Sequence, residues 1–282
     1  MLATVYDDPF AFAPLARDVL RRHPVACNVP ASFLDEILND RRRPADGERW
    51  VLVLDGREPV AVGMWTPPWN LFLSPTMAEV DAVARALAAA LAALPLPGLT
   101  GDEPLALAFL EAWTETTGQP TEVTLRERLY EITEPVPPGR VPQAVGAMRR
   151  AGEPDLDLLV AWLAAFHAEA MPDEPWDDGE ALTRTRLLTR RLFLWEDGAS
   201  ARCLLGLTHP AVGVCRVGPV YTPPEHRGRG YAGALVSAAT NLALRDAATV
   251  ALYADLANPT SGPLYERIGY RPIGDAIMAR FG

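Results

Sequence analysis

One proline-rich segment divides this chain into two halves. Residues 135–142 read Pro-Val-Pro-Pro-Gly-Arg-Val-Pro, which places four prolines and a glycine in eight positions. Proline has no backbone N–H and fixes φ, so neither a helix nor a central strand runs through such a segment. The chain has 282 residues, and at roughly 100–200 residues per domain this length fits two compact units. We therefore expect two domains, residues 1–138 and residues 139–282.

Composition argues against several classes of protein. All 26 basic residues are Arg, and 36 acidic residues bring the formal net charge to −10. Because nucleic-acid binding usually needs a basic face, we expect no nucleic-acid partner. The three cysteines, Cys27, Cys203 and Cys215, form no CxxC pair, so we expect no metal site and no disulfide framework, and a cytoplasmic location. No apolar run reaches the ~18 residues that a membrane span needs, so we also expect no membrane partner.

The second half alternates strands and helices. Apolar spacing predicts helices over 155–170, 231–242 and 263–268, and strands over 190–196, 201–208, 212–222, 249–255 and 270–281. Asp197-Gly198 predicts a hairpin between the first two of these strands.

The first half repeats this layout faintly. Segments 50–54, 59–65 and 71–73 predict strands, and segments 77–94 and 105–118 predict helices. On the first of these helices Val83, Leu87 and Leu91 share one face. We interpret this as a duplication with a degenerate first copy, although any two halves of mixed helices and strands can be aligned by eye.

The strongest local signal is a glycine-rich turn between a strand and a helix. Gly228, Gly230 and Gly233 lack Cβ atoms, so several backbone N–H groups can point at one anion, and Arg227 and Arg229 add charged donors. The turn predicts a phosphate or pyrophosphate site. A plain connection stays open, as does a dinucleotide site, because the glycines space as GxGxxG and Asp255 follows ~25 residues on.

A second segment, residues 252–270, adds to this signal. Arg227, Gly230 and Ala232, followed by Asn258, Tyr265 and Gly269-Tyr270, resemble the two ordered motifs of the GNAT acetyltransferase superfamily. The resemblance covers about residues 145–282 well and residues 1–135 only as a degenerate copy. It implies an α/β (α+β) protein of two GNAT-like domains, each a mixed, mostly antiparallel twisted sheet flanked by helices. In the C-terminal domain two strands would splay apart to hold CoA.

The resemblance also implies roles for individual residues. Acetyl-CoA would be the co-substrate, with its pantetheine arm in the gap after Pro219. The backbone at the strand end would bind that arm through Val220, Tyr221 and Thr222. The turn would hold the pyrophosphate through Gly228, Arg229, Gly230, Tyr231, Ala232 and Gly233, with Arg227 beside them. The side-chain amide of Asn258 would bind the pantetheine. Tyr265 would be the general acid for the departing thiolate, unless it is only a core tyrosine.

The general base stays unassigned. The family often has a Glu five residues before the Asn, and here that position is Tyr253. Asp255, Glu169, Glu174 or a water remain candidates, and Asp255 is also suited to capping the turn that follows it.

The acceptor is expected to be a small-molecule amine. Six acids between 169 and 180, which are Glu169, Asp173, Glu174, Asp177, Asp178 and Glu180, either form a solvated loop or attract a cationic amine, with Trp176 as a cation–π face. His167, His226 and the run Arg41-Arg42-Arg43 are interpreted as solvated surface residues. The leading hypothesis is an N-acetyltransferase, and the alternatives are a non-catalytic acyl-CoA sensor and a dinucleotide binder.

Overall fold

The computed structural model describes residues 1–141, 144–172, 176 and 179–282. Contacts divide the chain into two compact units. Unit 1 consists of Met1–Leu129, Ala254–Asn258 and Pro272–Gly282, and unit 2 consists of Tyr130–Tyr253 and Pro259–Arg271. The chain first leaves unit 1 before the proline-rich segment and returns to it at two later points. The boundary at 138/139 stays a prediction.

Both halves of the chain run through one order of elements, β-α-α-β-β-β-α-β-α-β. The first half contains β1 (Leu2–Tyr6), α1 (Pro9–Arg22), α2 (Asn28–Leu38), β2 (Arg49–Asp55), β3 (Glu58–Trp65), β4 (Leu71–Leu73), α3 (Val80–Leu91), β5 (Gly98–Asp102), α4 (Glu103–Thr117) and β6 (Thr121–Ile132). The second contains β7 (Ala147–Arg150), α5 (Leu156–Ala170), α6 (Gly179–Leu188), β8 (Leu192–Asp197), β9 (Ser200–Leu207), β10 (Val214–Tyr221), α7 (Tyr231–Ala243), β11 (Thr249–Asp255), α8 (Ser261–Ile268) and β12 (Arg271–Phe281). The predicted duplication is therefore confirmed in the fold.

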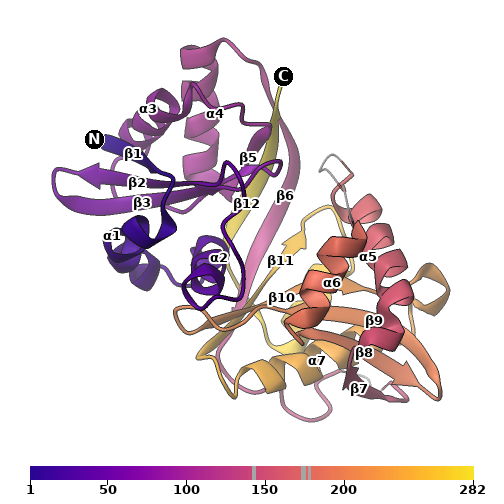
Figure 1. The fold of residues 1–282 in the computed structure, drawn as a ribbon. Coiled ribbons are helices and arrows are strands. Elements are labelled where there is room, and N and C mark those ends of the chain that lie inside the picture. The colour runs from indigo at the N-terminus through magenta and orange to yellow at the C-terminus, as the bar shows by residue number, and fades with distance from the viewer. Residues whose placement is uncertain (142–143, 173–175, 177–178) are drawn as a thin grey trace. The chain divides into compact units, whose positions relative to one another are not determined.

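In unit 1 the strand order is β1-β2-β3-β4-β5-β12-β6. Neighbouring strands from β1 to β4 are antiparallel, and β4 and β5 are parallel. The last strand of the chain, β12, pairs antiparallel with β5, from Ala276 opposite Asp102 to Arg280 opposite Gly98; Figure 1 shows it in yellow beside β5. The second half thus contributes a strand to the sheet of unit 1.

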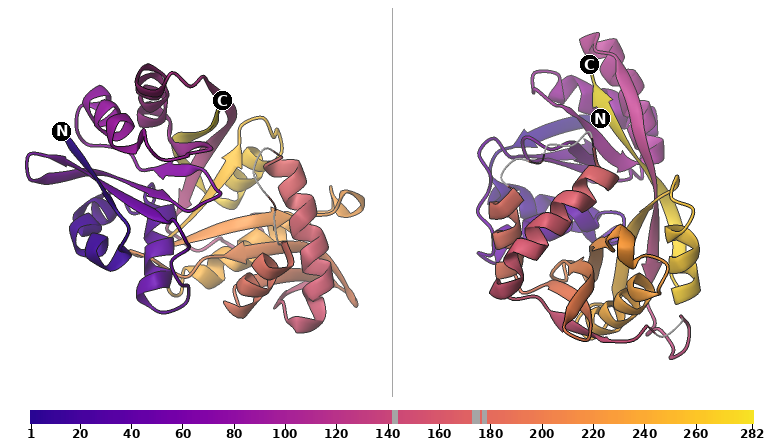
Figure 2. Two further views of the ribbon diagram at one scale, coloured as in Figure 1. Left: turned by 45° about the horizontal axis from the view of Figure 1, so that its top comes forward. Right: turned by 90° about the vertical axis from the view of Figure 1, so that its right-hand side faces the viewer.

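Alternation of side chains along β2 gives the sheet of unit 1 two apolar faces. Val51 and Val53 belong to the core beneath α3 and α4, which pack against each other (Figure 1, Figure 2). Trp50 points to the opposite face, where its ring lies 5.2 Å from that of Phe12 on α1. The predicted helix face of α3 is confirmed, because all three of its residues have no exposed surface; these are Val83, Leu87 and Leu91.

Unit 2 has the strand order β7-β8-β9-β10-β11. All of these pairs are antiparallel except β10 with β11, which is parallel. Helices α5 and α6 cover one face, where Leu159 and Leu163 pack on Leu194 and Leu204, while α7 packs on β8, β9 and β10. The fold is a mixed α/β architecture with a mostly antiparallel sheet, as the sequence predicted.

Candidate active site

The parallel pair β10 and β11 is joined over only part of its length. Its ladder runs from Val214 opposite Thr249 to Arg216 opposite Ala251, and no further pairing between these strands occurs among the described residues. The next residues of β10 form a bulge against β9, at the register shift between Val217 and Val220. The bulge bends β10 where its pairing with β11 stops. The two strands therefore open toward their carboxyl ends, as predicted.

A tight contact fixes this bulge. A Cβ on Gly206 of β9 would lie 2.7 Å from the carbonyl oxygen of Gly218, so only glycine allows β9 to approach so closely. Pro219, which follows a cis peptide bond, adds no N–H in the bulge. Val220 and Tyr221 then pair with Leu205 and Leu204 of β9.

The glycine-rich turn leads directly into α7. Gly228 and Gly230 have φ of +75° and +84°, and Gly230 is the N-cap of the helix. The first intrahelical bond runs from the N–H of Ala234 to the carbonyl of Gly230 over 3.0 Å. The N–H groups of the preceding helical residues have no acceptor within the helix, so they can bind an anion together with the helix dipole. These residues are Tyr231, Ala232 and Gly233.

Arg227, which was predicted to lie beside the pyrophosphate, makes an ion pair and a hydrogen bond with other residues of the described chain. Its Nη2 donates to Oε2 of Glu169 on α5 over 2.6 Å, and its Nε donates to the carbonyl of Thr222 over 2.9 Å. The guanidinium also lies 5.9 Å from the ring centre of Tyr221. Burial, together with the charge of Glu169, raises the pKa of Tyr221. Arg229, in contrast, is exposed.

Tyr265 lies on α8 in the buried part of unit 2. Its ring lies about 6 Å from those of Tyr130 and Tyr270, at 6.2 and 6.0 Å. Burial, with a smaller effect of the Cys203 thiol, raises the pKa of Tyr265 to about 12. The hydroxyl of Thr222 donates to Sγ of Cys203 over 3.2 Å. The buried thiol of Cys203 thus contacts the end of β10 and contributes to the electrostatic environment of Tyr265.

Asp255 caps the turn after β11. Its Oδ1 accepts from the N–H of Ala257 over 2.7 Å, and its carbonyl accepts from the N–H of Asn258 over 3.2 Å. The capping interpretation of Asp255 is therefore confirmed. Asn258 lies in a segment that counts with unit 1, and its role at the pantetheine stays a prediction.

The structure describes only part of the acidic stretch that was predicted either to form a solvated loop or to attract a cationic amine. Asp173, Glu174, Asp177 and Asp178 lie outside the described residues. The two described members, Glu169 and Glu180, each pair with an arginine, Arg227 and Arg184. Whether this stretch attracts a cation stays a prediction.

The prediction that His167 is solvated was wrong, and the predictions for His226 and for the run Arg41-Arg42-Arg43, of which Arg41 and Arg43 are exposed, hold in part. His167 is 4% exposed and stacks on Trp176 with ring centres 4.8 Å apart, because it follows Leu163 by four residues and so shares its face. His226 is half-buried and lies 3.4 Å from Nη1 of Arg202. Arg42 binds a buried carboxylate, as described next.

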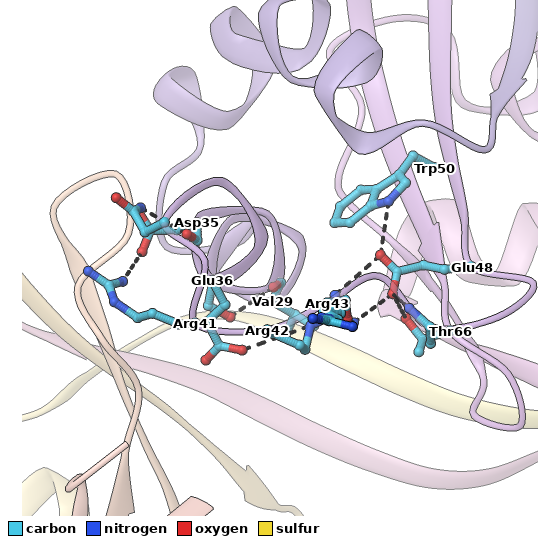
Figure 3. Close-up of polar contacts among 12 residues, drawn as sticks. Val29, Asp35, Glu36, Arg41, Arg42, Arg43, Glu48, Trp50 and Thr66 are labelled. Carbon is cyan, nitrogen blue, oxygen red and sulfur yellow. Dashed lines mark hydrogen bonds and ion pairs between the residues drawn. The ribbon is translucent and has the colours of Figure 1, made fainter. Parts of the chain in front are cut away.

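Glu48 of unit 1 is 3% exposed and fully bonded (Figure 3). Arg42 donates to its two oxygens over 2.7 and 3.2 Å, and Trp50 Nε1 donates to Oε1 over 3.1 Å. Thr66 lies 3.5 Å away. This network holds the loop before β2 in place. We therefore interpret the ion pair of Arg42 with Glu48 as structural.

Unit 1 has no open strand pair at the position that corresponds to β10 and β11. The ladder between β4 and β5 spans all of β4, from Leu71 opposite Leu99 to Leu73 opposite Gly101. A Cβ on Gly101 would lie 2.6 Å from the carbonyl oxygen of Leu73. Of the two units, only unit 2 has the opened strands and the glycine-rich turn among the described residues.

The described residues contain no group of His, Cys, Asp or Glu suited to a metal ion. None of the described helices has the length and apolar character of a bilayer span. Sequence reasoning missed Arg202, although an arginine within the apolar strand Ser200–Leu207 was a visible signal.

Comparisons with known proteins agree with this geometry. The family of FR47-like proteins matches residues 205–278, which include β10, the glycine-rich turn and α8. No curated protein matches the chain in sequence.

Solved structures match over nearly the whole chain. A GCN5-related N-acetyltransferase from Sphaerobacter thermophilus is 18% identical with a TM-score of 0.61, covering 99% of this chain and 96% of that one. A GNAT-family acetyltransferase from Colwellia psychrerythraea is 11% identical, with a TM-score of 0.57 and coverage of 100% and 99%. A tandem GNAT protein from the clavulanic acid biosynthesis pathway is 11% identical, with a TM-score of 0.58 and coverage of 99% and 98%. The chain thus has the fold of these GNAT proteins, one of which is a tandem GNAT protein.

Proposed function

We propose that this protein is an N-acetyltransferase that transfers the acetyl group of acetyl-CoA to a primary amine of a small acceptor. The opening between β10 and β11 carries this proposal. Beyond Arg216 and Ala251 the two strands no longer pair, so an extended pantetheine can take the place of a strand there. The turn at Gly228 and Gly230 offers N–H groups to the pyrophosphate.

The reaction we propose is direct attack. The neutral amine attacks the thioester carbonyl, and an N–H of Val220 or Tyr221 stabilises the oxyanion. Tyr265 acts as general acid at the departing sulfur. Because burial raises the pKa of Tyr265 to about 12, its hydroxyl is protonated at neutral pH. The phenol donates a hydrogen bond to the departing sulfur and passes its proton to it as the C–S bond breaks, and the proton that the amine releases after attack restores the phenol.

One observation favours the second candidate, a non-catalytic acyl-CoA sensor. Of the carboxylates considered as general base, Asp255 caps a turn and Glu169 pairs with Arg227, while the strand position of the family's Glu is Tyr253. The amine would then have to arrive uncharged, and a water or the group that leaves would have to accept the proton that the amine releases after attack.

A screen of amines with detection of released CoA tests the proposal. We expect turnover with at least one amine, and at least a tenfold loss of turnover in Tyr265→Phe with a dissociation constant for CoA within twofold of the parent. CoA binding without turnover on any amine would favour the sensor, and an unchanged rate in Tyr265→Phe would overturn the role of Tyr265 as general acid. NAD binding in place of CoA would support the dinucleotide site.

A further inference from the structure

Two side chains beside the glycine-rich turn, Arg202 and His226, are hydrogen-bonded to each other, and each has one further buried nitrogen without a hydrogen-bond partner among the described residues. Arg202 is on β9, and His226 ends the 3₁₀ turn Pro224–His226 that precedes the glycines. Nη1 of Arg202 lies 3.4 Å from Nε2 of His226. Nε of Arg202 and Nδ1 of His226 are each buried and have no hydrogen-bond partner among the residues that the structure describes.

The contact itself identifies both left-over atoms as donors. A guanidinium has no acceptor atom, so Nε2 of His226 accepts in this contact. A neutral imidazole then carries its proton on Nδ1, a tautomer assigned here from the hydrogen bond. Nε of Arg202 always carries a proton. Two N–H donors are thus buried without an acceptor, an arrangement that costs free energy unless a ligand supplies one.

The charge around this pair favours an anionic ligand. No ion pair joins the half-buried guanidinium of Arg202 to a carboxylate in the described part of the chain. The next residue after His226 is Arg227, whose guanidinium already binds Glu169. Glu225, the preceding residue, is exposed. An oxyanion at Arg202 and His226 would accept both hydrogen bonds and offset the charge.

We propose that Arg202 and His226 form a subsite for an oxyanion of one of the two substrates, a phosphate of CoA or an acidic group on the acceptor amine. The proposal rests on the proposed function and adds to it two binding residues outside the glycine-rich turn. His226 Nδ1 and Arg202 Nε each donate one hydrogen bond to this group.

Calorimetric titration of the full chain with acetyl-CoA and with dephospho-CoA tests the subsite. We expect Arg202→Leu and His226→Ala each to weaken acetyl-CoA binding at least tenfold if the group is a CoA phosphate. His226→Asn, whose amide nitrogen can replace Nδ1, should stay within threefold of the parent. Arg245→Leu removes an exposed arginine and should change nothing. If dephospho-CoA binds parent and Arg202→Leu equally, the group is the 3′-phosphate; if not, it is the pyrophosphate.

A second experiment measures KM for the amines that the parent acetylates. A tenfold rise in KM for acidic amines, with CoA binding unchanged, would support the subsite and assign it to the acceptor. Unchanged CoA binding and unchanged KM in both variants would overturn the subsite and leave the proposed function intact. Should Arg202→Leu not fold, the comparison of His226→Ala with His226→Asn decides.

Failure of the proposed function has a different signature. If the parent binds no acetyl-CoA, inorganic pyrophosphate becomes the probe in a thermal-shift assay. A stabilisation of the parent that Arg202→Leu abolishes would keep the subsite without the acetyltransferase. No stabilisation of the parent would overturn both.

Discussion

Arg227 and Glu169 are ion-paired over 2.6 Å, with 49% of each side chain exposed. The arginine lies in the motif that the sequence assigns to the pyrophosphate, and the glutamate was a candidate base. In the chain without ligand the two therefore satisfy each other.

This pair gives a first testable prediction. In Glu169→Gln the guanidinium is released and a nearby negative charge is lost, so CoA should bind more tightly. Because exposed pairs contribute only about 0–1 kcal/mol, the gain should not exceed about fivefold. Calorimetry measures it, and Glu180→Gln, which breaks another exposed pair of unit 2 with Arg184, serves as control. Weaker binding in Glu169→Gln would mean that the glutamate positions Arg227.

A comparison of alanine variants at two glycines with similar φ distinguishes an effect on ligand binding from an effect of backbone strain. Gly228 and Gly213 have φ of +75° and +78°, and a Cβ on either meets nothing closer than 3.8 Å. Alanine at either position should cost about 1 kcal/mol of stability, because a left-handed backbone is strained for L-residues. Only Gly228→Ala should also weaken CoA binding. Equal CoA affinity in the two variants would argue against an anion site at the turn.

The buried phenol of Tyr265 makes stability depend on alkaline pH. Its pKa is about 12 in the folded chain and ~10 in an unfolded one. The folded state holds the proton more tightly, so this contribution is complete below pH 10 and is lost as pH rises to about 12. The parent should lose stability over that window, and Tyr265→Phe should lose less. Denaturant titrations at pH 9, 10 and 11 measure how the free energy of unfolding changes with pH. An equal change in parent and variant would contradict the assignment of this pH dependence to Tyr265.

Glu48 provides a test of the packing in unit 1. Glu48→Gln removes the nearer of two carboxylates paired with Arg42, and only Glu36, 4.0 Å from its Nε, remains. We expect a loss of about 2–3 kcal/mol, less than the ~3–5 kcal/mol of fully buried pairs, because 19% of the Arg42 side chain is exposed. Glu58→Gln breaks the exposed pair with Arg22 and should cost under about 1 kcal/mol. Chemical denaturation compares them, and similar midpoints would refute the ranking.

Local signals predicted much of this fold. The strand Thr249–Asp255 has the bounds that its apolar run predicted, and the turn at Asp197-Gly198 joins β8 to β9. Both depend on residues close in sequence, where periodicity and turn chemistry decide. Helix α1 was not predicted, although its buried residues Phe12, Ala16, Val19 and Leu20 recur at helical spacing, because Pro14 inside the segment argues against a helix.

Contacts between distant segments could not be predicted in the same way. The glycine-rich turn was visible in the sequence, but the pairing of Arg227 with Glu169 depends on how α5 packs on the sheet. The contact of Arg202 with His226 joins residues 24 positions apart. Such pairs could not be predicted, because residues so far apart in sequence form no local pattern.

The pairing of β12 with β5 has a consequence for synthesis of the chain. Domains generally fold as units, N-terminal first, as they leave the ribosome. Here β5 ends at Asp102, whereas the strand that pairs with it begins at Arg271. Until those residues emerge, the edge of β5 has either no partner or a provisional one, and an open strand edge invites association with other chains. The half that is translated first therefore receives one of its strands only after Arg271–Phe281 have been translated, and until then the open edge of β5 would favour aggregation.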